Sequence, residues 1–239
     1  MSGWTVIRFW KAVTVAQEEG GYAVLLDARS VRTPSKAPLL MPSRAMAEAV
    51  AAEWAAVEDK VDPRLMPITR RVNAAIDKVA VQFDEVAQLV ADYGGSDLLC
   101  YRAEAPEALV AAQAEAWDPL LDWAAEAYGT RLKVTRGVAP VAQPTEALAR
   151  LADEVRATTQ FQLTALYDLV GLSGSLILGL AATRAEFDAE SLWAFSRIDE
   201  DWQAGQWGED EEASANAALK RMDFLQAHHF WELSSASPE

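Results

Sequence analysis

The sequence predicts an α+β fold, with a small N-terminal antiparallel β domain (residues 1–43) followed by a larger all-helical domain (residues 44–239). Three observations support this division. About half of the 239 residues are apolar, which is enough to form a sizeable core. Before Ser43, glycines and prolines separate short alternating runs. After Ser43, the apolar residues follow helical spacing.

The β domain is predicted from the stretch between Phe9 and Met41. Gly20 and Gly21 can adopt the positive φ angles that a hairpin turn requires. Prolines further along the stretch limit the length of the strands, because proline cannot donate a backbone hydrogen bond. We therefore expect two or three antiparallel strands.

The helical domain should begin at Ser43, whose side chain can cap the first helix, and Pro67 is suited to open the second helix. Pro119 should kink or divide the long helical stretch that follows Pro106. A stray strand is possible in residues 131–137, and further helices are expected near residues 82–93, 145–157, 159–170, 174–182, 190–206 and 209–233.

Charge and cysteine content exclude several classes of protein. The chain has 21 Lys and Arg residues against 36 Asp and Glu, which gives a net charge of −15. Nucleic acid would be repelled by this charge, so we expect no nucleic-acid partner. Cys100 is the only cysteine, which excludes an intramolecular disulfide and a site of clustered thiolates, and fits a reducing compartment.

No segment resembles a secretory signal or a membrane span. Arg8 and Lys11 interrupt the N-terminal apolar residues. The longest nearly uncharged run, from Leu169 to Ala182, is shorter than the ~20 residues that cross a bilayer. We expect neither export nor membrane insertion.

The motifs of common enzyme sites do not occur. There is no phosphate-binding loop, and the glycine cluster at Gly171 fails the G-x-S-x-G spacing by one residue. His228 and His229 are adjacent, so on a helix their side chains would diverge by about 100° and would not readily share a metal. Cys100 is expected to be a core residue, because its neighbours are apolar. The sequence predicts no catalytic residue, no metal and no cofactor.

Residues 199–212, DEDWQAGQWGEDEE, combine seven carboxylates and two tryptophans with no basic residue. Tryptophan supplies large rigid area at protein interfaces, and carboxylates attract a basic partner. On one continuous helix, Trp193, Glu200 and Trp207 would share a face, with the carboxylate between the two indoles. The alternative is a solvated acidic helix whose tryptophans point into the core.

Five motifs occur in order over nearly the whole chain. They are EW at Glu53, MPITRRVNAAID at Met66, SDLLCYR at Ser96, WDPLLDW at Trp117 and the acidic segment at Asp199. With these motifs the sequence resembles the assembly chaperones for the alpha subunit of the ATP synthase catalytic head, which occur in mitochondria and alphaproteobacteria.

The resemblance implies a binding protein without catalysis. Such a chaperone holds the unassembled alpha subunit and shields the surface that later meets the beta subunit. Trp54 and Arg70 are further candidate contacts that are equally compatible with a structural role. The resemblance places the main partner contacts at Asp199, Glu200, Gln203, Trp207, Gly208 and Glu209.

The mitochondrial relatives carry an N-terminal targeting extension, whereas this sequence starts a few residues before the matching RFWK. We therefore expect a bacterial cytoplasm, with the mitochondrial matrix as the location of the organellar relatives. We also expect the free protein to be a monomer. Two other hypotheses stay open at this point: a small-molecule-binding protein or enzyme with a pocket between the two domains, and a helical adaptor for another basic protein.

Overall fold

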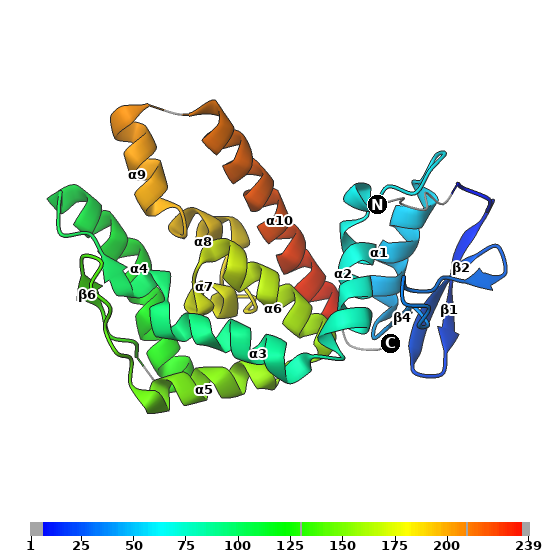
Figure 1. Cartoon of the computed structure of the whole chain (residues 1–239), viewed down its shortest axis with the longest axis horizontal. Helices are drawn as coiled ribbons and strands as arrows, with labels where there is room; N and C mark the ends of the chain where they lie inside the picture. The colour runs from blue at the N-terminus through cyan, green and yellow to red at the C-terminus, as the bar shows by residue number, and fades with distance from the viewer. Residues whose placement is uncertain (1–6, 130, 209, 236–239) are drawn as a thin grey trace. The chain divides into compact units, whose positions relative to one another are not determined.

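The computed structural model describes residues 7–129, 131–208 and 210–235 (Figure 1). Antiparallel strands come first and helices make up most of the rest, which confirms the predicted α+β fold. The domain boundary expected after residue 43 stays a prediction. The helical residues up to residue 83 belong to the same compact unit as the strands. Unit 1 consists of Met1–Phe83, Thr159–Ala165 and His229–Glu239, and unit 2 consists of Asp84–Thr158 and Leu166–His228.

Unit 1 contains a four-stranded antiparallel sheet in which the central strand, β2, pairs with each of the others. Gly20 and Gly21 form the β1–β2 turn with φ angles of 92° and 149°. The predicted strands and glycine turn are confirmed. The sheet has four strands, whereas two or three were expected. The strands are β1 (Val13–Glu18), β2 (Gly21–Leu26), β3 (Arg29–Ser30) and β4 (Leu40–Met41).

Helix α1 (Arg44–Ala55) packs on this sheet and begins where the sequence predicts. The Ser43 hydroxyl accepts a hydrogen bond from the Met46 amide (3.1 Å) and donates one to the Leu233 carbonyl (2.7 Å). The inward side of α1 belongs to a core of buried residues that includes Trp10, Val24, Met41, Met46, Ala47 and Val50.

Helix α2 (Pro67–Ala74) begins at the predicted proline and continues as one turn of π-helix, η2 (Ala75–Val79); a short 3₁₀ turn, η1 (Pro63–Leu65), precedes it. The Glu53 carboxylate accepts hydrogen bonds from the Ile68 and Thr69 amides, both at 2.7 Å. Because the first amides of a helix have no partner inside it, this carboxylate caps α2 and fastens it to α1.

Unit 2 is mainly helical, and its 22-residue helix α4 runs undivided through Pro119, so of the kink or division expected there, the division does not occur. The stray strand is confirmed as β6, which pairs in parallel with β5. Helices α6 and α10 extend into unit 1. The elements from α3 onward are α3 (Phe83–Asp92), η3 (Tyr93–Ser96), η4 (Leu98–Cys100), β5 (Tyr101–Arg102), α4 (Glu107–Tyr128), β6 (Thr135–Arg136), α5 (Thr145–Arg156), α6 (Gln160–Ser173), α7 (Leu176–Ala181), α8 (Ala189–Phe195), α9 (Ile198–Trp207) and α10 (Glu211–Ser235).

The apolar run from Leu169 to Ala182 is divided between α6 and α7 at Gly174, which has a φ of 72°. A Cβ on Gly179 would collide with the Val170 side chain, so glycine allows α7 to lie close against α6. Within the described ranges, every helix is too short or too polar to cross a bilayer.

Candidate partner-binding site

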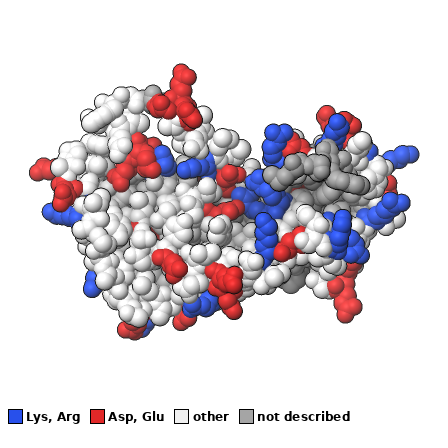
Figure 2. All heavy atoms as spheres, in the orientation of Figure 1, with Lys and Arg blue, Asp and Glu red and all other residues white. Residues whose placement is uncertain are grey.

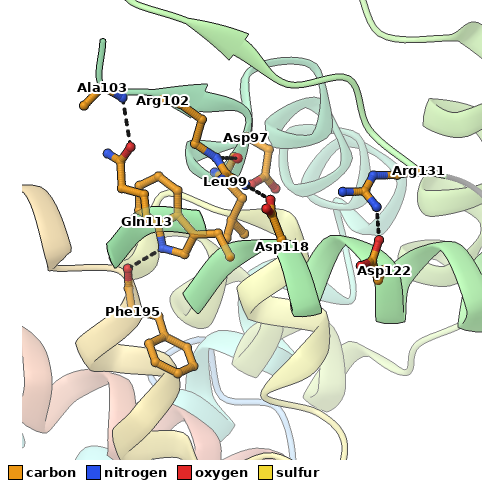
Figure 3. Close-up of polar contacts among 10 residues, drawn as sticks. Asp97, Leu99, Arg102, Ala103, Gln113, Asp118, Asp122, Arg131 and Phe195 are labelled. Carbon is orange, nitrogen blue, oxygen red and sulfur yellow. Dashed lines mark hydrogen bonds and ion pairs between the residues drawn. The ribbon is translucent and has the colours of Figure 1, made fainter. Parts of the chain in front are cut away.

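One arginine joins two of the sequence motifs (Figure 3). Arg102 pairs with Asp118 on α4 at 2.8 Å, and its Nε donates to the Leu99 carbonyl at 2.8 Å. The guanidinium also lies over the Trp117 ring, 5.2 Å from its centre. The SDLLCYR and WDPLLDW motifs therefore form part of one buried support.

Trp117 determines where α8 ends. Its ring is fully buried, and its Nε1 donates to the Phe195 carbonyl at 2.8 Å. In a continuous helix that carbonyl would accept from the amide of Asp199, four residues further on. The expected single helix over residues 190–206 is therefore wrong, and α9 starts afresh at Ile198.

A second residue of α4 holds the first turn of α9. Gln113 is buried, with its side-chain oxygen accepting from the Ala103 amide (2.8 Å) and its nitrogen donating to Asp199 Oδ1 (2.6 Å). Asp199, predicted as a partner contact, is thus half-buried and bound to α4. Its observed interaction fixes the position of α9.

The other predicted contacts on α9 face solvent. Glu200, Gln203 and Trp207 are exposed, and 73% of the Trp207 surface is accessible. Gly208, with a φ of 93°, ends the helix. Glu209, also a predicted contact, lies outside the described residues.

The predicted face with Glu200 between two indoles is wrong. Trp193 lies on α8, is only 6% exposed and packs against Phe224 with ring centres 5.7 Å apart. Glu200 pairs instead with Arg197 at 2.7 Å, and the Arg197 guanidinium lies over the Trp193 ring. One tryptophan of the pair therefore belongs to the core and the other, Trp207, to the surface.

A cleft of about 790 Å³ runs along α9, and the beginnings of α4 and α10 complete its lining. It brings together Glu200, Gln203, Trp207 and Gly208, four of the predicted contacts. The lining also contains Trp202 of the acidic segment, and small or apolar residues that the sequence did not single out, namely Leu109, Ala204, Ala213 and Ala217.

The described contacts that hold the α10 wall of the cleft begin at Arg221. Phe224 is fully buried and Arg221 pairs with Glu190 of α8 through its Nε at 2.8 Å. Residues 211–222 are exposed except for half-buried Ala217. The available sequence signal was the run EEASANAA at Glu211, which is helical in composition but lacks the large apolar residues that would pack it into a core.

Trp54 and Arg70 belong to unit 1, whereas the other predicted contacts belong to unit 2. Trp54 is half-buried against the unit 1 core, with its ring centre 5.4 Å from that of Trp10. Arg70 is exposed on α2. The geometry of Trp54 is that of a packing residue.

The net charge is confined to one unit. Unit 1 has 11 basic and 11 acidic residues, and unit 2 has 10 basic and 25 acidic residues, so the whole charge of −15 lies in unit 2. Figure 2 shows blue side chains gathered over unit 1 and mostly red ones over unit 2. The α9 cleft therefore lies in the strongly acidic unit.

Two buried titratable groups lie apart from the cleft. Cys100 is buried, as predicted, and burial raises the pKa of its thiol to about 12. Asp97 is fully buried and accepts hydrogen bonds from the Ser175 hydroxyl (2.7 Å) and the Ile177 amide (3.0 Å) at the start of α7. Burial raises the pKa of this carboxyl to about 6. No group of three or more potential metal ligands occurs among the residues described.

Comparisons with known proteins agree with the arrangement of the motifs. The family model for the ATP12 chaperone protein matches residues 7–125. The crystal structure of Atp12 from Paracoccus denitrificans is 55% identical, with a TM-score of 0.93 over 95% of this chain and 98% of that chain. The crystal structure of the Atu1473 protein from Agrobacterium tumefaciens is 45% identical, with a TM-score of 0.90 over 95% of this chain and 86% of that chain.

A more distant relative is the mitochondrial protein atp12 of Schizosaccharomyces pombe. It is 25% identical over 218 residues, which cover 86% of this chain and 75% of the relative. The likeness to the Paracoccus protein extends over almost the entire length of both chains and includes both units. This chain is a member of the ATP12 chaperone family.

Proposed function

We propose that the chain binds the unassembled alpha subunit of the ATP synthase catalytic head and shields its beta-facing surface until assembly. Chaperones of this family act in ATP synthase assembly, so the partner is sought in that head. The observation that carries the proposal is the α9 cleft, where the exposed Trp207 lies beside the carboxylates of Glu200, Asp201 and Asp210.

The chemistry of the cleft suits an interface that is exposed only temporarily. A subunit surface awaiting its neighbour presents apolar area that would aggregate, together with charged groups that later form ion pairs. An exposed indole covers apolar area, and carboxylates complement lysine or arginine. The acidic field of unit 2 would speed the encounter without deepening the bound state to the same degree, which suits a partner that must be released.

The proposed contacts are Glu200, Gln203, Trp207 and Gly208, with Glu209 adjacent to them in sequence. Asp199 supports them by holding α9 through Gln113. Arg70, exposed on α2, remains a proposed contact of unit 1, and Trp54 is proposed to stabilise the core there.

The chain is proposed to act by binding alone, as a monomer and without nucleotide. Holding and releasing a subunit requires complementary surface and a competitor for it, and neither requires a covalent step. A bacterial cytoplasm is the proposed location, since the two bacterial structures share 55% and 45% identity with the chain against 25% for the mitochondrial relative.

The test is an aggregation assay with purified alpha subunit. We expect an equimolar amount of the chain to suppress light scattering by the alpha subunit, and added beta subunit to displace the chain. Unchanged aggregation would refute the chaperone role toward this client. A stable complex of all three proteins with an intact alpha–beta interface would refute the shared surface.

A further inference from the structure

The α10 wall of the cleft is built from small side chains, whereas the α9 wall includes the large side chains of Trp202 and Trp207. On α10, Ala213 and Ala217 lie four residues apart in the lining, and on α9 the small residue of the lining is Ala204. Residues four apart lie on one face of a helix, so the α10 wall carries only small side chains along this face. Small side chains allow the backbone of another element to approach closely.

The lining of the cleft combines apolar and acidic residues. Leu109, which is 9% exposed, and the exposed Pro106 contribute apolar surface at the start of α4. Three carboxylates contribute to the lining, and Arg197, the basic residue among them, is paired with Glu200. An occupant would therefore meet apolar surface together with a net negative charge, because three carboxylates line the cleft against one arginine.

The two helical walls also limit the backbone of the occupant. The amides and carbonyls within α9 and α10 are engaged inside their own helices, so the walls offer no open row of donors and acceptors to a strand. A helix brings its backbone hydrogen bonds with it and needs only side-chain contact. Figure 1 shows α9 and the first half of α10 as two separate helices. A client helix would lie between them as a third helix.

We propose that this cleft receives one amphipathic helix of the client, with small or apolar residues turned toward Leu109 and Ala213, and lysine or arginine turned toward Glu200 and Asp201. The inference rests on the proposed function and adds the kind of client segment that is bound. Charge complementarity favours this occupant, because the surrounding unit carries the entire net charge of −15.

A site-directed photo-crosslink tests the inference. Cys100 is buried, so a cysteine introduced on the surface can be labelled selectively. Ala213→Cys places the label in the cleft, and Ala215→Cys places it on an exposed position of α10 that is outside the lining. Each full-length variant is labelled with a benzophenone maleimide, mixed with alpha subunit and irradiated, and the crosslinked peptides are identified by mass spectrometry.

We expect the Ala213→Cys label to crosslink roughly tenfold more alpha subunit than the Ala215→Cys label. The crosslinks should fall in one helical client segment with apolar residues at three- and four-residue spacing and at least one lysine or arginine. Crosslinks to a strand or loop, or equal yields at the two positions, would overturn the inference while leaving the proposed function in place. Wild-type chain that fails to bind alpha subunit would overturn both.

A filled cleft provides a second, label-free readout. Ala217→Trp inserts an indole into the lining, whereas Ala218→Trp adds the same side chain at an exposed position beside it. We expect Ala217→Trp to weaken alpha-subunit binding by roughly tenfold or more and Ala218→Trp to leave it nearly unchanged. Far-UV circular dichroism and the unfolding midpoint confirm that both variants fold. Equal affinities of two folded variants would contradict occupancy of the cleft.

Discussion

Trp207 leaves 73% of its surface accessible at the end of α9, although tryptophan is on average among the more buried residues. Two other tryptophans of unit 2 have partners: Trp193 packs on Phe224, and Trp117 donates to the Phe195 carbonyl. An indole without such packing contributes little to folding and is available for a partner.

Trp207→Ala should therefore separate binding from stability. Truncating a central interface tryptophan typically costs at least ~2 kcal/mol of binding energy, which is a loss of roughly thirtyfold in affinity for the alpha subunit. The free energy of unfolding should change by only about 0.5 kcal/mol. Titration calorimetry and urea unfolding measure the two quantities. Leu89→Ala, at a residue 57% exposed on α3, is the control, and an equal loss of affinity in both variants would count against Trp207.

Glu200→Lys reverses a charge in the cleft lining. If Glu200 meets a basic client group, the substitution replaces attraction by repulsion and should abolish capture of the alpha subunit. The ion pair with Arg197 is also lost. Because the Glu200 side chain is 52% exposed, this loss should affect folding little. Capture on immobilised alpha subunit and circular dichroism provide the two measurements. Glu126→Lys, at an exposed position of α4 outside the cleft, should bind normally. Normal capture by Glu200→Lys would remove Glu200 from the interface.

Asp97 gives the fold a specific pH dependence. Because the pKa of this carboxyl is about 6 in the folded protein, above the ordinary value of 3.8, the folded state binds a proton that the unfolded state has released. The contribution of Asp97 to stability is therefore full at low pH and declines as the pH rises through about 6. Asp97→Asn cannot ionise, so the unfolding free energy of the wild type minus that of this variant should fall between about pH 4 and pH 7. A constant difference over this range would show that Asp97 does not titrate there.

At the scale of the element, sequence reasoning succeeds where the signal is local. The Ser43 cap, the proline at the start of α2 and the glycine turn all depend on residues next to one another in the chain. The separation of α8 from α9 depends on Trp117, far away in sequence, whose indole takes the Phe195 carbonyl. Spacing alone could not reveal that bond, and for this reason Trp193 and Trp207 could not be assigned to core and surface.

The candidate site was predicted in part for the same reason. Trp207 and Glu200 lie in a stretch of unusual composition, and the family resemblance pointed to it. Ala213 and Ala217 matter through their small size, and alanines at helical spacing are common in any helix. Only the placement of α10 beside α9 gives them a role.

Asp199 belongs to the element scale because its carboxylate connects α9 to α4 through Gln113. Asp199→Asn keeps an oxygen that can accept from the Gln113 side chain, so alpha-subunit affinity should be largely retained. Asp199→Ala removes the acceptor and leaves a buried amide without its partner, which should lower the unfolding free energy by about 1–3 kcal/mol and weaken binding through a displaced α9. Equal and complete loss of binding in two stable variants would instead identify the negative charge as a direct contact.

At the scale of the molecule, the distribution of charge follows the division into units. Unit 1 has no formal net charge and has the sheet core, and unit 2 carries the cleft and the charge of −15. A concentrated field of one sign raises the association rate with a basic partner and is weakened by salt. Apolar contacts of Trp207 with a partner would not be screened in this way. We therefore expect salt to slow the association of the complex more than it speeds its dissociation.

The central claim is that unit 2 binds the alpha subunit through α9 and the first half of α10. Hydrogen exchange of the full-length chain, measured with and without alpha subunit, tests it most directly, because the exposed turns of residues 211–222 should exchange readily when the protein is free. The account predicts that alpha subunit slows exchange in residues 198–222, while the buried strands of unit 1 are unaffected. Protection confined to unit 1, with residues 198–222 exchanging as in the free chain, would contradict it.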